Sequence, residues 1–322
     1  MDFSSILKNE MANYINLCKS EGKSTMSIVS GLRNLDMFLD SIGHSTKKFP
    51  TDLVENWISQ LHPLKKTTIK WNVIVVRQFF SYLRYLGIDV FLPEVPAYRS
   101  DHIPYAFSDE ELTLLFAAVD TLPYQRKDGK KSAIQFSVYL RILYGCGLRS
   151  GEALKLRQCD IDFNSGTLAI NCAKGKKDRL VPMKNSLTQL LAVYSRQLVD
   201  GKSCEYLFAR GNGKPRDVHW AYAWFQRTLQ QAGITYEKEK YERAGPCPYS
   251  MRHSFIHRAY RQYADASNHS FDDIMPFLSA YVGHENANGT DRYFRYDSDL
   301  FVKDNELMDS IIDDLLPEDY NE

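Results

Sequence analysis

A proline-rich stretch without hydrophobic periodicity, FLPEVPAYRSDHIP at residues 91–104, divides the chain into two dissimilar parts. Its three prolines rule out a continuous helix, because proline lacks a backbone N–H and restricts the residue before it. We interpret residues 91–106 as a linker, which agrees with the two domains that a length of 322 residues suggests.

Residues 1–90 carry four helical patterns and no strand pattern. Apolar residues recur three and four positions apart between Ile6 and Cys18, and again over about 28–39, 53–61 and 67–86. We therefore predict a compact helical bundle for this part.

Residues 107–296 have a mixed pattern. Ser108 and Glu111 have the spacing of a capping box and predict the start of a helix. Residues 160–183 form short β-prone runs separated by turn residues, which is typical of a small antiparallel sheet. Further helical patterns in this part cover about 131–144, 150–156, 185–199, 217–232, 250–264 and 272–281. One more helical pattern, over about 304–316, lies in the tail that follows. The predicted fold class is mainly α, with a small antiparallel β-sheet in the second domain.

The formal net charge of zero hides an uneven distribution. Of the 40 basic and 40 acidic residues, only one basic but ten acidic ones lie within 297–322. A basic body with an acidic tail is typical of a nucleic-acid binder whose tail contacts protein, although an ordinary mixed surface accounts for it as well.

Cysteine usage and the first residues indicate a reducing compartment. The six cysteines are scattered without a CxxC pair, which argues against a zinc site or a disulfide framework. The first residues lack the features of a signal peptide, and no apolar run is long enough to span a bilayer. We therefore expect a cytoplasmic protein.

Gly145 and Gly147 interrupt a helical pattern, and Arg149 stands where the next helix is expected to begin. A guanidinium held at such a break can bind a phosphate through two hydrogen bonds. Glu152, three residues further on, is spaced as an ion-pair partner for the arginine. Alone, the pattern is more typical of a surface arginine with a local salt bridge.

Two further basic positions fit a phosphate. Lys174 is the lysine nearest the first strand of the predicted hairpin AKGKKDRLVP, whose tip can reach into a DNA groove. Arg252 and His253 lie in the first turn of a predicted helix after Pro248, where backbone N–H groups favour anions. Each position alone is more typical of a solvated basic turn.

The stretch GHENANGTDRYFRY, residues 283–296, places tyrosines in a polar segment that offers little to bury their rings. Tyr293 follows His284 by nine residues.

Together, two arginines can hold a phosphodiester, a lysine can protonate a leaving oxygen, a histidine can hydrogen-bond the phosphoryl group and a tyrosine can attack. The set describes nucleophilic catalysis with a covalent phosphotyrosine. Without a P-loop or carboxylate cluster, we expect no cofactor and no metal.

The order of these residues resembles the tyrosine recombinases of the phage integrase family. The motifs GLRSGEAL and KGKKDRLVP and the spacing from His284 to Tyr293 carry the resemblance, which covers about residues 107–296. It implies a two-domain clamp. Residues 1–90 would be the helical core-binding domain that binds DNA, 107–296 the catalytic domain, and 297–322 an acidic tail able to contact another protomer.

The resemblance also implies a role for each position of the motif. Arg149 and Arg252 would hold the scissile phosphate, and His284 would hydrogen-bond it. Lys174 would protonate the leaving 5′-oxygen. Tyr293 would be the nucleophile that forms a 3′-phosphotyrosine.

One position departs from the family pattern. Tyr249 stands three residues before the second arginine, where the family usually has histidine. A phenol with a pKa of about 10 is a poor base at neutral pH, but it can donate a hydrogen bond to a phosphate oxygen. Glu152 and His253 occupy supporting positions.

Several alternatives stay open. Tyr296 is a rival nucleophile, although the spacing from His284 favours Tyr293. The same fold without chemistry would serve a DNA-binding regulator, and the same tyrosine chemistry serves a type IB topoisomerase. Within recombination, Tyr249 and the long connector over 233–248 favour integration, excision or transposition of a mobile element over chromosome-dimer resolution.

The expected partner is double-stranded DNA, with no membrane involved. The resemblance implies a homo-oligomer on DNA, a tetrameric synapse at the nucleoid, with or without sister recombinases. The amphipathic helix expected over 304–316 packs either on a neighbouring protomer or on its own domain, since amphipathicity does not determine which surface the apolar face covers.

Overall fold

The computed structural model describes residues 3–98, 105–124, 127–171, 178–198, 205–236, 245–267 and 271–283. The chain divides into two compact units, Met1–Asp101 and His102–Glu322. Each unit has a hydrophobic core of its own, as expected of separate domains.

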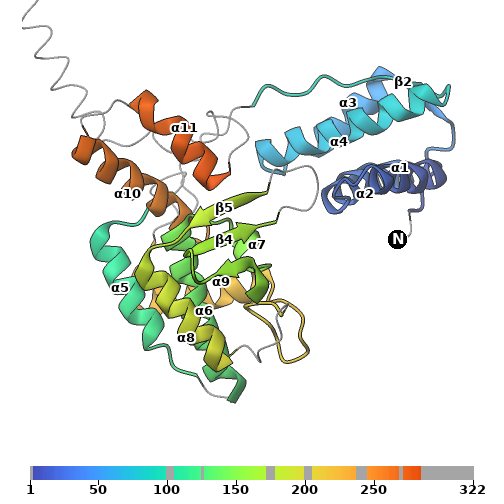
Figure 1. The fold of residues 1–322 in the computed structure, drawn as a ribbon. Helices are drawn as coiled ribbons and strands as arrows, with labels where there is room; N and C mark the ends of the chain where they lie inside the picture. Colours follow the sequence, from blue (N-terminus) through green and yellow to red (C-terminus); the bar gives the residue numbers. More distant parts are fainter. Residues whose placement is uncertain are drawn as a thin grey trace, which may run out of the picture. The chain divides into compact units, whose positions relative to one another are not determined.

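The first unit contains the predicted helical bundle. Its helices are α1 (Lys8–Ser20), α2 (Met26–Ser41), α3 (Thr51–Gln60) and α4 (Lys66–Tyr85) (Figure 1). The long helix α4 packs against both α1 and α2. Its Phe79 and Phe80 are fully buried, together with Trp57 of α3, so the apolar face of α4 forms the centre of this core.

The expectation that the first 90 residues contain no strand was wrong. Strands β1 (Lys48–Phe49) and β2 (Asp89–Val90) form a short parallel pair, in which Phe49 lies opposite Val90. Both of these side chains are buried. A two-residue strand is too short to show the alternation from which strands are predicted.

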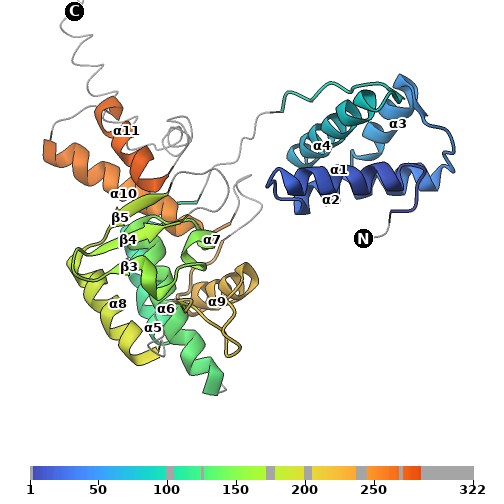
Figure 2. The ribbon, with the colours of Figure 1, turned by 45° about the vertical axis from the view of Figure 1, so that its right-hand side comes forward.

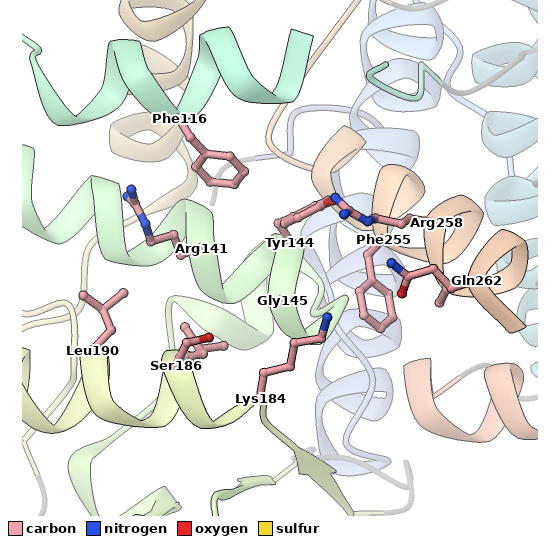
Figure 3. A pocket seen from close by; sticks show the side chains of 12 residues that line it. Phe116, Arg141, Tyr144, Gly145, Lys184, Ser186, Leu190, Phe255, Arg258 and Gln262 are labelled. Atoms are coloured by element: carbon pink, nitrogen blue, oxygen red, sulfur yellow. The ribbon is translucent and has the colours of Figure 1, made fainter. Parts of the chain in front are cut away.

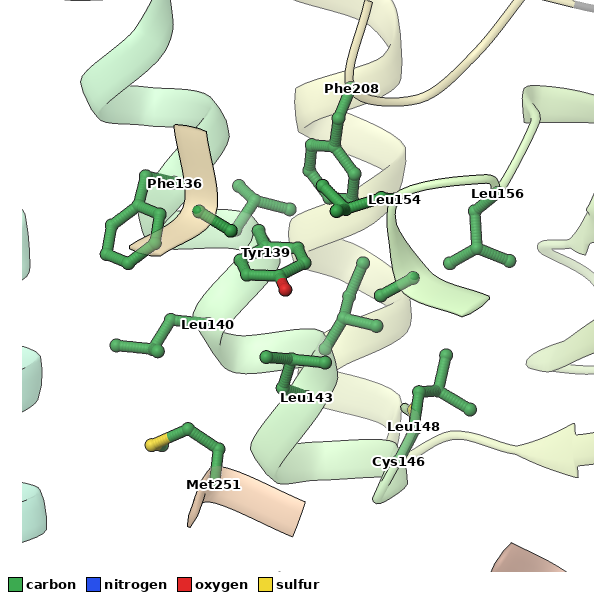
Figure 4. Packing of buried hydrophobic residues seen from close by; sticks show 14 of the residues in the cluster. Phe136, Tyr139, Leu140, Leu143, Cys146, Leu148, Leu154, Leu156, Phe208 and Met251 are labelled. Carbon is green, nitrogen blue, oxygen red and sulfur yellow. The ribbon is translucent and has the colours of Figure 1, made fainter. Parts of the chain in front are cut away.

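Helix α6 (Lys127–Cys146) lies at the centre of the second unit. It contacts α5 (Asp109–Asp120), α8 (Asn185–Leu198), α9 (Val218–Gln231) and α10 (Ser250–Ser267). Figure 4 shows Tyr139 and Leu143 of α6 packed among Phe208, Leu156 and Met251 from other parts of the chain. The predicted capping box at the start of α5 is confirmed, since the Ser108 hydroxyl and the Glu111 carboxylate each accept from the other residue's backbone N–H.

The predicted small antiparallel sheet is also confirmed. Strands β3 (Ile161–Asp162), β4 (Thr167–Ile170) and β5 (Arg179–Pro182) lie side by side in that order (Figure 2). A 3-10 turn, η1 (Gln158–Asp160), leads into β3. Leu168 lies opposite Val181, and both are buried against the α6 core.

Two helices near the sheet frame the candidate site. Helix α7 (Ser150–Ala153) is one turn long, shorter than the 150–156 expected, and α11 (Phe271–Val282) packs against α10 through a small third core. Within the described ranges, no helix is long and apolar enough to cross a membrane. The same residues contain no cluster of three His, Cys, Asp or Glu side chains suited to a metal ion.

Candidate active site

A tight turn between α6 and α7 positions Arg149. Gly147 has a φ of 58°, and a Cβ at this position would lie 2.4 Å from Cδ1 of Phe255. Only glycine therefore fits both the left-handed backbone and the neighbouring ring. Two residues later, Arg149 is the N-cap of α7, as its place in the sequence predicted.

The Arg149 side chain is held by two protein groups and remains partly accessible. Its Nη1 donates to Oε1 of Glu152 at 2.8 Å, so the expected pair is present. Its Nη2 donates to the Gly283 carbonyl at 2.8 Å. The side chain is 28% exposed.

Arg252 reaches the same place from α10. Its Nη1 donates to the Gly147 carbonyl and its Nη2 to the Val282 carbonyl, each at 2.7 Å. Its exposure is 0%, so the solvated first turn suggested by the sequence alone is absent here. Arg149 and Arg252 thus bind neighbouring carbonyls at the end of α11, where a helix leaves acceptors without partners and favours cations.

Glu152 joins Arg149 to a second arginine, Arg179 of β5. Oε2 of Glu152 accepts from Nη2 of Arg179 at 2.8 Å, and Oε1 accepts from its Nη1 at 3.2 Å. Burial on its own raises the pKa of Glu152. The hydrogen bonds from Arg179 and Arg149 and the charge of Arg179 outweigh burial and lower this pKa to about 2. The carboxylate is therefore charged at neutral pH and fixes both guanidinium groups.

Sequence reasoning missed Arg179. A signal was present in the alternation of β5, because residues two apart share a face of a strand. Val181 is buried while Leu180 between them is 70% exposed, so Arg179 stands on the inward face. An arginine at an inward strand position needs a buried partner, and here that partner is Glu152.

Tyr249 and His253 lie beside each other at the start of α10. The two rings meet edge to face, with centroids 4.8 Å apart. Tyr249 is half-buried and His253 is buried. The phenol that replaces the usual histidine therefore stands next to an imidazole and within one turn of Arg252.

Lys174, His284, Tyr293 and the rival Tyr296 lie outside the described residues, so their roles stay predictions. The described ranges border two of them in the sequence. Strands β4 and β5 are paired as far as Ile170 and Arg179, on either side of the segment that contains Lys174. Gly283, whose carbonyl binds Arg149, is the residue immediately before His284.

Residues 107–299 match the phage integrase family, which covers more than half of the chain. The chain belongs to this family. It is therefore a tyrosine recombinase, an enzyme that breaks and rejoins DNA strands.

Named relatives agree with the membership. The recombinase is 25% identical over 272 residues to "Tyrosine recombinase XerC" of Staphylococcus carnosus (strain TM300), covering 81% of this chain and 82% of the relative. It is 26% identical over 298 residues to "Putative integrase/recombinase y4rB" of Sinorhizobium fredii (strain NBRC 101917 / NGR234), covering 90% and 92%.

The fold is shared with solved recombinase structures. The XerH site-specific recombinase, in a post-cleavage complex with palindromic difH substrate, has a TM-score of 0.68 at 20% identity, over 88% of this chain and 79% of that one. The Tn1549 transposon integrase in complex with transposon right end DNA has a TM-score of 0.65 at 17% identity, over 94% and 99%. The expected fold class, mainly α with a small antiparallel sheet, is confirmed.

Proposed function

We propose that this recombinase cuts and rejoins double-stranded DNA at specific sites through a 3′-phosphotyrosine intermediate on Tyr293. The observation that carries the proposal is the pairing of Arg149 and Arg252 on neighbouring carbonyls, immediately before His284. Two guanidinium groups held this close together suit a phosphodiester and the additional charge of its transition state.

In the proposed reaction, the hydroxyl of Tyr293 gives up its proton to water as its oxygen attacks the scissile phosphorus, and the bond from phosphorus to the 5′-oxygen breaks. Lys174 gives a proton to that leaving oxygen, while Arg149, Arg252 and His284 stabilise the phosphoryl oxygens. One phosphodiester bond is exchanged for another, so rejoining needs no external energy source. Because Arg252 is fully buried, we expect DNA binding to uncover its guanidinium.

The test uses nicked duplexes with a randomised central sequence, because a nick beside the cleaved bond lets a short strand escape and traps the intermediate. Adducts that survive SDS are captured and sequenced, and the duplex recovered most often becomes the standard substrate. An adduct supports strand cleavage, whereas DNA binding without any adduct supports a regulator with this fold. Relaxation of a supercoiled plasmid without paired sites supports a topoisomerase.

Replacing Tyr249 by phenylalanine is expected to slow cleavage without abolishing it. The phenol can donate a hydrogen bond to a phosphate oxygen, and losing a bond to a charged group corresponds to a slowing of about 10- to 100-fold. The measurement is the single-turnover rate of adduct formation on the standard substrate. Loss of all detectable adduct would show that Tyr249 does more than assist, and an unchanged rate would remove it from the site.

We propose that the biological role is integration, excision or transposition of a mobile element, carried out by a homo-oligomer at the nucleoid. The support is the departure at Tyr249 and the long connector over 233–248. A second candidate role is chromosome-dimer resolution. It is supported by the similarity to XerC, whose sequence identity to this chain is nearly the same as that of y4rB. Sequencing of the recovered duplexes separates the two roles, since element ends and a single chromosomal site differ in position.

A groove on the catalytic domain suits the acidic tail. Two adjoining hollows of about 550 and 590 Å³ share Phe255 and Lys184 among their lining residues. Figure 3 shows the rings of Phe255 and Tyr144 lining the first hollow together with the basic side chains of Lys184 and Arg258. Phe277 of α11 adds an exposed ring to the second hollow. An apolar groove with basic residues complements an acidic amphipathic segment.

We propose that residues 304–316 of a neighbouring copy occupy this groove. A chain that ends after residue 303 should still bind a single DNA site within a few-fold of the full chain, but fail to bring two sites together on native gels. Phe277→Asp in the full chain should reproduce that failure. At high dilution both proteins are monomers, and we expect them to melt at the same temperature. A truncated monomer that melts several degrees lower than the full monomer would contradict the contact between copies, because the tail would then stabilise its own domain.

A further inference from the structure

Three arginines bind the end of α11 in a row. The successive carbonyls of residues 281–283 accept hydrogen bonds from Arg179, Arg252 and Arg149, at 3.1, 2.7 and 2.8 Å. The three side chains come from β5, α10 and the α6–α7 turn, which are far apart in the sequence. The end of α11 therefore serves as a common anchor for guanidinium groups from three elements.

Arg179 uses all three of its guanidinium nitrogens in hydrogen bonds to protein groups. Its Nε donates to the Tyr281 carbonyl, and its Nη1 and Nη2 both donate to the Glu152 carboxylate. Its side chain is 11% exposed, between that of Arg149 at 28% and the fully buried Arg252. Every nitrogen of the Arg179 guanidinium thus bonds to protein, in an arrangement suited to holding Glu152 and the end of α11 in place.

We infer that Arg179 is a positioning residue for strand cleavage: it sets the orientation of Arg149 through Glu152 and the path of the chain into His284 through Tyr281. The inference rests on the proposed function. It adds to that function a residue that acts through Glu152 and the Tyr281 carbonyl.

The link from Arg179 to Arg149 passes through one carboxylate. Glu152 is 12% exposed and bonds to both guanidinium groups, so each arginine restricts where the other can lie. Without Arg179, a largely buried carboxylate would have one arginine left to neutralise it, and Arg149 would lose the fixed partner that orients it.

The link from Arg179 to the segment after α11 is steric as well as polar. Gly283 has a φ of 70°, and a Cβ there would lie 2.7 Å from Nη1 of Arg179. The turn therefore runs directly against the guanidinium, in a backbone conformation that glycine adopts readily. His284 follows Gly283 in the sequence, so displacement of Arg179 would alter the backbone that leads to it.

The test compares Arg179→Met with Arg216→Met, using the nicked duplex selected above. Arg216 is a matched control because it is also a half-buried arginine of this domain, with hydrogen bonds to Gln135 and Ser132. We expect Arg179→Met to slow single-turnover cleavage about 100-fold at saturating DNA while binding changes less than about threefold. Arg216→Met should lower the melting temperature comparably but leave cleavage within about threefold of wild type.

A pH series provides a readout that a general loss of stability would not change. Arg179 and Arg149 lower the pKa of Glu152 to about 2, so in the wild type this carboxylate loses its proton well below pH 5. Without Arg179, burial shifts the pKa upward, and protonation would release Arg149 at a higher pH. The ratio of wild-type to Arg179→Met cleavage rates should therefore grow as the pH falls from 7 to 5.

Arg179→Lys tests the geometry in a variant that keeps the charge. A lysine cannot bind both carboxylate oxygens and the Tyr281 carbonyl in the fork geometry of arginine, so we expect at least a tenfold loss of cleavage. Cleavage by Arg179→Lys at the wild-type rate, or by Arg179→Met at the rate of the Arg216 control, would overturn the inference. Absence of an adduct with the wild type would instead count against the proposed function itself.

Discussion

Replacing Tyr293 by phenylalanine is expected to leave DNA binding intact and to remove the covalent protein–DNA adduct. The substitution deletes only the oxygen proposed to attack phosphorus, so the arginines and the helical first unit should keep their contacts. Loss of a nucleophile in covalent catalysis lowers the rate by at least about 10⁴-fold. The measurement is adduct formation on the nicked substrate, resolved on a denaturing gel.

Tyr296→Phe is the matched control, because it removes the same oxygen three residues away. We expect it to form adduct within a few-fold of the wild type. An adduct that survives in Tyr293→Phe but disappears in Tyr296→Phe would transfer the role to Tyr296 and contradict the assignment from the spacing to His284.

Replacing Arg149 by lysine is expected to lower the cleavage rate by about 10²- to 10³-fold, with a much smaller effect on DNA affinity. Lysine keeps the positive charge but cannot bond at once to Glu152, the Gly283 carbonyl and a phosphate oxygen. Loss of one preorganised donor to a developing negative charge has an effect of this size. Single-turnover rates at saturating DNA separate the chemical step from binding.

Arg157→Lys is the control for Arg149→Lys. Arg157 lies in the same domain, where its guanidinium stacks over the Tyr206 ring at 4.8 Å. We expect its cleavage rate to stay within about threefold of wild type, since a stacking contact at the surface does not act on the phosphate. Equal losses in the two variants would mean that Arg149 acts through general charge or stability, and not at the reacting phosphate.

Local patterns in the sequence predicted local features well. The glycine break at Gly147 placed Arg149 at a helix start, and the pair Ser108 and Glu111 marked the start of α5. The change from helical periodicity to short β-prone runs predicted a small antiparallel sheet, which the structure shows to have three strands. Each of these depends on residues within a few positions of one another, which is the range over which propensity and periodicity act.

Features created by distant contacts could not be predicted in this way. The complete burial of Arg252 depends on carbonyls from Gly147 and Val282, and the basic turn around it is ordinary when taken alone. The β1–β2 pair joins segments that are 41 residues apart at Phe49 and Val90, with too few residues to show a strand pattern. The family resemblance predicted Arg252 as a site residue, but the burial of its side chain is visible only in the structure.

The most direct test of the central claim is to identify the residue that carries the DNA. The wild-type adduct on the selected nicked duplex is digested with protease and nuclease, and the modified peptide is sequenced by mass spectrometry. We predict a nucleotide joined through its 3′-phosphate to Tyr293, with a free 5′-hydroxyl on the released strand. A nucleotide on any other residue, or a link through a 5′-phosphate, would contradict the proposed mechanism.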